Sequence, residues 1–279
     1  MRVAFQGETG AFSEDAVRAL FPTSEPIPFL SFDAVFEAVA SGEVDRGVIP
    51  IENSLFGSVH ANYDLLQSND LWITDEISVR IRHHLMGLPG TRLEDIRKVY
   101  SHPQALGQCS KFLRERLSHV EAIPAYDTAG SAKMIASRGE RDAGAIASLQ
   151  AAREYGLEIL AHNIENNQHN YTRFLALARK EEGEPSVPEG PAKTSIVYAM
   201  RENVPGALFK SLAVFALRDL DLYKIESRPL IGSPGNYLFY LDLQGSIGSD
   251  VVQRAIEHLR EIAAFVRVLG SYPIGRMLD

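Results

Sequence analysis

The chain has 279 residues, enough for one or two domains with substantial cores, and its 45% hydrophobic and 23% charged content is ordinary for a globular protein. A net charge of −8 argues against a general nucleic-acid surface or an anionic-membrane surface. Cys109 is the only cysteine, so no internal disulfide can form. With no apolar segment long enough for a signal peptide or a membrane span, we expect a cytoplasmic protein with no membrane or nucleic-acid partner.

The N-terminal half predicts the same order of elements twice, namely strand, helix, strand, helix and strand. The first run starts at strand 2–6 and the second at strand 98–101. Each run ends in the motif G-E-x-D-x-G-x-I, at residues 42–49 and 139–146. Chance recurrence of a charged turn is the alternative. The matching order favours two similar parallel α/β lobes.

Two crossovers join these lobes and predict a clamshell, similar to periplasmic binding proteins, with its ligand in the cleft. Lobe one is expected at about residues 1–77 plus 165–178, and lobe two at about 78–164. The returning segment, HNYTRFLAL at 169–177, is polar at first and then apolar. It predicts that Thr172 and Arg173 face the cleft as the chain enters the sheet. A β-branched strand residue beside an ion-pairing arginine is the plainer reading.

Three further polar clusters are expected at the cleft. The turn GETGAFS includes Thr9, Ala11, Phe12 and Ser13, and its backbone N–H groups could hold an anion. Asn53 and Ser54 follow a predicted strand in lobe one, and Ser101 and Gln104 hold the equivalent place in lobe two. For Asn53 and Ser54, helix capping is as cheap an explanation as ligand contact. For the GETGAFS turn by itself, and for His102, which could otherwise be a base, a helix cap is the plainer reading. Nothing has the spacing of a metal site or a nucleotide fingerprint, so no metal and no cofactor is expected.

Residues 179–193 are charged and rich in proline and glycine, which predicts a linker. The catalytic region would then be 1–178. Behind the linker, residues 194–279 predict strands and helices in the order βαββαβ, a ferredoxin-like domain suited to ligand sensing or oligomerisation.

The motifs GETGAFS, PIENSLFGSV, SHPQALGQC, YDTAGSA and NYTRF, followed by GALF and ESRP, occur in that order. In them the chain resembles the monofunctional prephenate dehydratases over essentially its whole length, with a C-terminal domain similar to the ACT regulatory module. Ala11 departs from the family pattern, which has Thr or Ser there. The resemblance implies that prephenate loses CO₂ and water to give phenylpyruvate, without a metal or redox cofactor, in phenylalanine biosynthesis.

The resemblance also implies residue roles. Thr172 would assist departure of the hydroxyl, Arg173 would bind a carboxylate, and Phe174 would pack beside the ring or in the core. The clusters described above would anchor the other polar groups. L-phenylalanine would bind as a feedback inhibitor where two ACT domains of a homodimer or homotetramer meet; the residues expected there are Gly206, Ala207, Leu208, Glu226, Ser227, Arg228 and Pro229. Arogenate as the substrate, or a clamshell that binds without catalysis, are the alternatives.

Overall fold

The structure is a computed structural model that describes residues 1–180 and 190–279. Its contacts divide the chain into two compact units. Unit 1 comprises Met1–Tyr63, Ile77–Leu175 and Arg276–Asp279. Unit 2 comprises Asp64–Glu76 and Ala176–Gly275. Each unit is considered by itself below.

The first sheet has the strand order β16-β5-β11-β3-β1-β2, with β4 paired to β3. Its strands are β1 (Arg2–Gln6), β2 (Glu25–Phe29), β3 (Arg46–Asn53), β4 (Gly57–Ser58), β5 (Leu71–Arg80), β11 (Tyr171–Arg179) and β16 (Arg276–Leu278). The helices between the early strands are α1 (Phe12–Leu20), α2 (Phe32–Ser41) and α3 (His60–Ser68). Strand β1 lies parallel to both β2 and β3.

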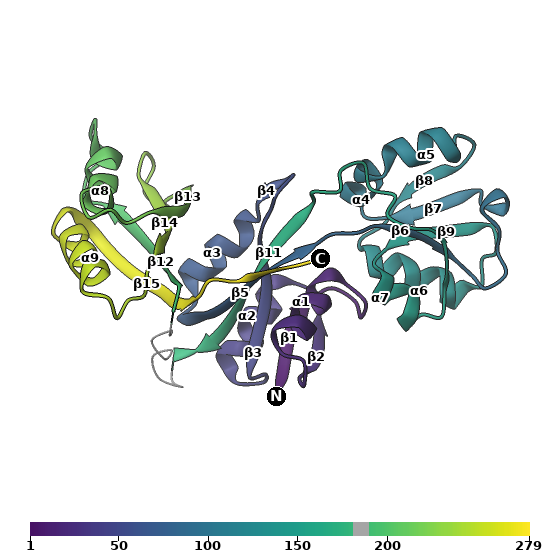
Figure 1. Ribbon diagram of the computed structural model, residues 1–279, viewed down its shortest axis with the longest axis horizontal. Coiled ribbons are helices and arrows are strands. Elements are labelled where there is room, and N and C mark those ends of the chain that lie inside the picture. The colour runs from purple at the N-terminus through teal and green to yellow at the C-terminus, as the bar shows by residue number, and fades with distance from the viewer. Residues whose placement is uncertain (181–189) are drawn as a thin grey trace. The chain divides into compact units, whose positions relative to one another are not determined.

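The second sheet has the order β10-β6-β9-β7-β8. Its strands are β6 (His84–Gly87), β7 (Lys98–Ser101), β8 (Glu121–Pro124), β9 (Ala143–Ala147) and β10 (Glu158–Ala161). Helices α4 (Pro103–Gln108) and α5 (Ser110–Arg116) lie on one side of this sheet, and α6 (Thr128–Arg138) and α7 (Leu149–Glu154) on the other (Figure 1). A short 3₁₀ turn, η1, spans Leu93–Asp95.

The predicted internal repeat is confirmed by the strand pairing. Strand β7 lies parallel to β8 and β9, just as β1 lies parallel to β2 and β3. In each motif copy, the first glycine has left-handed backbone angles and ends a helix: Gly42 (φ 79°) ends α2 and Gly139 (φ 66°) ends α6. A glycine adopts this conformation without steric cost, so both copies stop a helix and start a strand in the same way.

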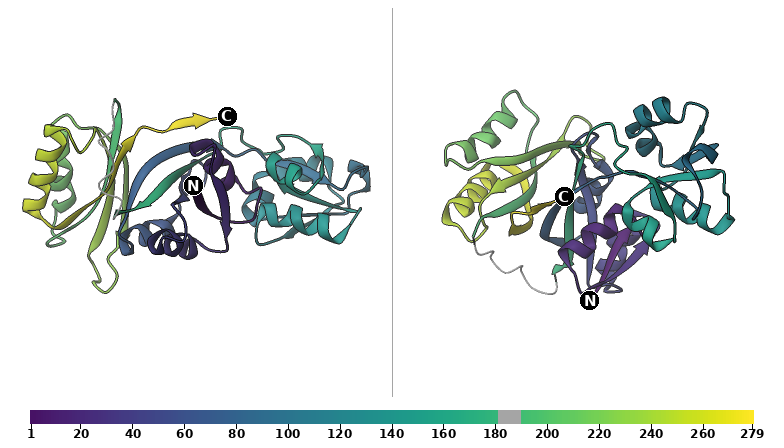
Figure 2. Two further views of the ribbon diagram at one scale, coloured as in Figure 1. Left: turned by 90° about the horizontal axis from the view of Figure 1, so that it is seen from below. Right: turned by 45° about the vertical axis from the view of Figure 1, so that its right-hand side comes forward.

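The third sheet confirms the ferredoxin-like order. Its four strands are antiparallel neighbours in the order β13-β14-β12-β15. The elements are β12 (Ala192–Met200), α8 (Ala207–Ala216), β13 (Leu222–Pro229), β14 (Tyr237–Gln244), α9 (Asp250–Ile262) and β15 (Ala263–Pro273). Both helices cover the same face of this sheet (Figure 2). The core between them is built on Tyr198, Phe215, Leu241 and Ile256.

Two predicted boundaries differ from the structure. Arg179 is the last residue of β11 and Lys193 lies inside β12, so the ends of the predicted linker are strand, and residues 181–189 lie outside the described residues. The predicted last domain ran to residue 279, yet Arg276–Leu278 form β16 and pair in parallel with β5 in unit 1. A strand this short has too little periodicity to stand out in a sequence.

Glycine lets β15 and the segment after it approach β5 closely within unit 2. A Cβ atom added at Gly270 would collide with the backbone of Ile73, and one at Gly275 with that of Glu76. Glu76 also accepts a hydrogen bond from the Gly275 N–H (2.9 Å) and an ion pair from Lys193 (2.7 Å). None of the described helices is long and apolar enough to cross a membrane.

Candidate active site

The ends of β3 and β11 bring Asn53 and Thr172 together. The Asn53 amide nitrogen donates to Thr172 Oγ1 (2.9 Å), to Asn170 Oδ1 (2.8 Å) and, at longer range, to the Tyr171 carbonyl (3.2 Å). These two segments are more than a hundred residues apart in the sequence, and the pairing of β3 with β11 in the first sheet makes them neighbours. The structure therefore joins two of the residues that the sequence singled out.

The orientation of the Asn53 amide is defined by its surroundings. Its oxygen accepts the backbone N–H groups of Leu55 (2.9 Å) and Phe56 (3.1 Å), so its NH₂ group must point to Thr172. Because Thr172 Oγ accepts this hydrogen bond, its own hydrogen is left to donate elsewhere. Among the described residues it donates to no acceptor. Thr172, only 9% exposed, is thus a buried hydroxyl prepared as a donor.

Arg173 does not join Thr172, which corrects the expectation that both side chains face the same cleft. Adjacent residues of a strand point to opposite faces. On the face opposite Thr172, Arg173 Nε lies 3.0 Å from Glu52 Oε1, and Glu52 is likewise the strand neighbour of Asn53. The Arg173 side chain is only 10% exposed. Its charge is therefore engaged within the protein, and the ion pair supports the pairing of β3 with β11.

Ser54 links the same two strands by hydrogen bonds, so its hydroxyl is already engaged within the protein. Its hydroxyl donates to the His169 carbonyl (3.0 Å) and accepts from the Tyr171 N–H (3.0 Å), while its own N–H donates to the Tyr171 carbonyl (2.8 Å). Next to it, Leu55 and Phe56 are 41% and 51% exposed. Phe174 is 2% exposed, which fits its packing role.

The turn that was expected to hold an anion is occupied by the protein's own carboxylates. The Gly10 N–H donates to Glu14 (2.6 Å) and the Glu8 N–H donates to Asp127 (3.2 Å). The Thr9 carbonyl accepts from the Tyr155 hydroxyl (2.8 Å). Ala11 is the N-cap residue of α1 and supplies no side-chain cap, and Ser13 is buried. This turn is built for docking between the lobes more than for free anion binding.

In lobe two, the structure does not bring Ser101 and Gln104 together in one cluster. The buried Ser101 hydroxyl donates to the Ile146 carbonyl (2.6 Å), so it supports the sheet. Gln104 is exposed on the first turn of α4. His102 is the N-cap of that helix, and its Nδ1 accepts the Gln104 N–H (3.3 Å), which confirms the capping interpretation.

Sequence reasoning gave no role to two further buried polar groups, Asn170 and His83. Asn170 is 0% exposed, and its Nδ2 has no hydrogen-bond partner among the described residues, although its oxygen accepts from Asn53. His83 Nε2 lies 2.5 Å from Gln108 Oε1, and burial lowers the pKa of His83 to about 4. The neutral ring therefore donates to Gln108 and fixes its amide. The polar start of HNYTRFLAL was the available signal for Asn170.

The residues expected to bind phenylalanine lie on α8 and β13 in unit 2. Gly206 has left-handed backbone angles (φ 82°) and precedes α8; Ala207 is buried and Leu208 is 38% exposed. On β13, Ser227 and Pro229 are exposed and Glu226 is half-buried. Arg228 is engaged by both carboxylate oxygens of Asp64 (3.0 and 2.6 Å). Its guanidinium is therefore tied to α3 in this structure.

Comparison with known proteins identifies the family. The prephenate dehydratase model matches residues 3–182. The chain belongs to the prephenate dehydratase family. Arogenate dehydratase 2 of Petunia hybrida is 49% identical over 98% of this chain and 72% of its own length.

Solved structures extend the likeness to the whole fold. A prephenate dehydratase from Arthrobacter aurescens, solved in complex with L-Phe, shares 34% identity and a TM-score of 0.89, covering 98% of this chain and 90% of that one. GqqA, described as a novel type of quorum quenching acylase, shares 33% identity and a TM-score of 0.88, covering 98% of each chain. This family membership agrees with the two-lobed region and the ferredoxin-like region of the chain.

Proposed function

We propose that the protein converts prephenate to phenylpyruvate, CO₂ and water, and that phenylalanine inhibits it as the end product of the pathway. The observation that carries this proposal is the Asn53–Thr172 hydrogen bond, which leaves the Thr172 hydroxyl free to donate. Family membership supplies the substrate class.

The elimination needs one proton, which the leaving hydroxyl takes up to depart as water. The electron pair of the C–CO₂⁻ bond moves into the ring as CO₂ leaves, and the ring hydroxyl departs with its own bonding pair. Thr172 donates its proton to that oxygen, so that water leaves, and solvent returns a proton to Thr172. Aromatisation supplies the driving force, and a positioned donor of this kind contributes roughly 10²–10⁴-fold.

Asn53 donates to both Asn170 and Thr172, so it holds together two residues that would each offer a donor to the substrate. The Asn170 NH₂ would donate to a substrate oxygen, because this buried donor has no partner among the described residues. The exposed Leu55 and Phe56 would contact the ring. Thr9, Ala11, Ser13 and Gln104 remain proposed wall residues, whereas Phe12 lines a separate cavity and Ser101 supports the sheet. Arg173 acts through its ion pair with Glu52 as a positioning residue.

Arogenate is the second candidate substrate, because the Petunia relative is named an arogenate dehydratase. The test measures kcat/KM with each substrate on the purified protein. Turnover of prephenate supports the proposal, and turnover of arogenate alone would transfer it to the second candidate. If both substrates were inert, the chain would be a clamshell that binds without catalysis.

Regulation by phenylalanine is proposed for the ferredoxin-like region, taken as an ACT domain. The support is the phenylalanine complex of the Arthrobacter structure and the position of Gly206 before α8. Exposed Phe209 (75%), Leu217 (80%) and Ile231 (88%) offer apolar surface for a homodimer or homotetramer. Because the one cysteine, Cys109, is buried and unpaired, we propose that the protein works in the reducing cytoplasm.

A further inference from the structure

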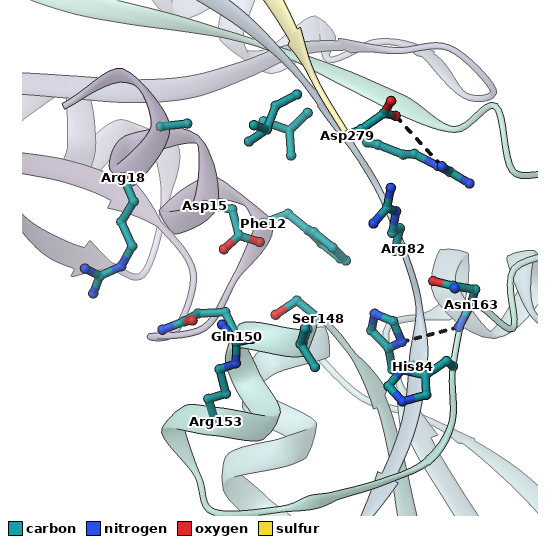
Figure 3. Close-up of a pocket in the computed structure, with 16 residues that line it drawn as sticks. Phe12, Asp15, Arg18, Arg82, His84, Ser148, Gln150, Arg153, Asn163 and Asp279 are labelled. Atoms are coloured by element: carbon teal, nitrogen blue, oxygen red, sulfur yellow. Dashed lines mark hydrogen bonds and ion pairs between the residues drawn. The ribbon is translucent and has the colours of Figure 1, made fainter. Parts of the chain in front are cut away.

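A cavity of about 600 Å³ lies wholly within unit 1, away from the Asn53–Thr172 site (Figure 3). Of the residues predicted to bind substrate, only Phe12 lines it. Along the crossover after β5, Arg82 and His84 face this cavity, whereas His83 faces Gln108. The His83 ring packs edge-on against Phe12, with the two ring centroids 5.5 Å apart.

The cavity carries an excess of positive charge in a chain whose net charge is −8. Four arginines line it, and two of them have partners: Arg18 pairs with Glu14 (2.5 Å) and Arg80 lies 3.8 Å from Asp279. Within the described part of the chain, Arg82 and Arg153 form no ion pair. A cation held in a concave site without a counter-charge attracts anions.

Its walls also contain an aromatic ring and aliphatic side chains. Phe12 projects from α1 into the open space, opposite the segment that carries Arg82 and His84 (Figure 3). Val79, Leu149 and Leu278 extend the apolar surface. Such a mixture of apolar wall and a few polar groups is typical of sites for small organic ligands, more than for inorganic ions.

Two acidic residues line this space: Asp279, which lies beside Arg80, and Asp15, which projects from α1 (Figure 3); His162 lines it as well. Burial, and then the nearby Glu14, raise the pKa of Asp15 to about 7, although Arg18 and Arg153 oppose the shift. Arg82 and His84 face it from the crossover, and burial lowers the pKa of His84 to about 4. Asp15 is thus mostly neutral about one pH unit below 7 and repels an anion increasingly as the pH rises through 7.

We propose that this cavity binds a small carboxylate with an apolar ring-bearing body, its carboxylate on Arg82 and Arg153 and its ring against Phe12. The proposal goes beyond the catalysed reaction and does not rest on it. The ligand binds more tightly below pH 7 than above, because protonated Asp15 no longer repels it.

The test uses 3-(4-bromophenyl)propanoate, a carboxylate that the enzyme cannot turn over. Crystals of the full chain soaked in it should show an anomalous bromine peak inside the cavity, with the carboxylate within hydrogen-bond distance of Arg82. In solution at pH 6, calorimetry should show the natural protein and Thr172→Val binding equally. Arg82→Gln and the exposed Arg153→Gln should each weaken the Kd at least tenfold, and the exposed α5 variant Arg116→Gln should not change it.

Bromine found only outside the cavity, or equal binding by Arg82→Gln, Arg153→Gln and Arg116→Gln, would overturn the proposal. Equal binding of the neutral amide of the probe would overturn its electrostatic part, and equal competition by inorganic phosphate would overturn the requirement for a ring. Should Arg82→Gln fail to fold, Arg153→Gln gives the same test. Loss of prephenate turnover in Thr172→Val with retained probe binding separates this proposal from the proposed function.

Discussion

At the scale of single residues, Asn53 decides what Thr172 can do. A threonine hydroxyl is a weak acid, so its usefulness depends on where its hydrogen points. Two backbone N–H groups hold the Asn53 oxygen, and its nitrogen then occupies Thr172 Oγ (2.9 Å). Catalysis by such a residue depends on geometry held in advance by the fold.

Asn53→Ala should therefore lower kcat by about 10–10³-fold, since the Thr172 hydroxyl can then turn away from the leaving oxygen. Thr172 itself stays in place, so substrate binding should change less than kcat. Steady-state kinetics with prephenate measures the split between kcat and KM. A variant with unchanged kcat would show that the hydrogen bond has no positioning role.

Asp15 makes the stability depend on pH. Its folded pKa of about 7 lies above the usual aspartate value of 3.8, because burial disfavours the charged form, so the folded state retains the proton. Its contribution is fully present below about pH 4 and is lost as the pH rises through 7, by an amount on the order of 1–4 kcal/mol.

Asp15→Asn should remove this part of the pH dependence and raise the free energy of unfolding at pH 8 relative to the natural protein. Urea unfolding at pH 5 and pH 8 measures both. The exposed Asp142→Asn is the matched control and should keep the natural profile. If Asp15→Asn and the natural protein lost stability in parallel between pH 5 and 8, Asp15 would not be the cause.

At the scale of elements, close approach between strands depends on glycine. β15 passes so near β5 that a Cβ at Gly270 would meet the Ile73 carbonyl, whose backbone cannot move aside without breaking the sheet. Helix α4 offers the contrast, because nothing lies within 4 Å of a Cβ added at Gly107.

Gly270→Ala should lower the free energy of unfolding by about 1–3 kcal/mol, as expected for overpacking. Gly107→Ala should be neutral or stabilising by up to about 1 kcal/mol, since alanine favours helix. Thermal and urea unfolding of the two variants give the comparison. Equal stabilities would contradict the close contact of β15 with β5.

The elements also show what a sequence can and cannot predict. The order of strands and helices, the repeat motif that begins at Gly42 and at Gly139, and the ferredoxin-like order follow from local periodicity and turn residues. The contacts that individual side chains make do not follow from these local patterns. Arg173 forms an ion pair with Glu52, which is far away in the sequence. The two residues meet only because β3 and β11 are adjacent strands in the sheet. A motif can mark Arg173 as important without revealing what it touches.

At the scale of the whole molecule, the proposed regulation requires that phenylalanine bind two states of the protein with different affinity. In unit 2, Arg228 of β13 holds Asp64 of α3, the helix that follows the Asn53 loop in the sequence. A ligand that engages Arg228 would compete with this ion pair and so reach α3.

Phenylalanine should therefore lower the turnover of the natural protein, with a coupling of about 1–3 kcal/mol, or roughly 5–150-fold in affinity. Asp64→Asn weakens the link, so the ratio of turnover without and with phenylalanine should fall. Assays over a range of phenylalanine concentrations measure this ratio. An unaltered ratio in Asp64→Asn would show that the ion pair plays no part in the coupling. If phenylalanine did not inhibit the natural protein, the proposed sensing role of the ferredoxin-like region would be wrong.

The measurement that bears most directly on the whole account is phenylpyruvate formation from prephenate by Thr172→Val and Thr172→Ser beside the natural protein. Valine keeps the shape of threonine and removes the donor, whereas serine keeps the hydroxyl. We predict that valine lowers kcat by about 10²–10⁴-fold while KM changes little, and that serine restores most of the rate. Equal rates in the valine variant and the natural protein, with both folded, would show that Thr172 is not the donor and contradict the account.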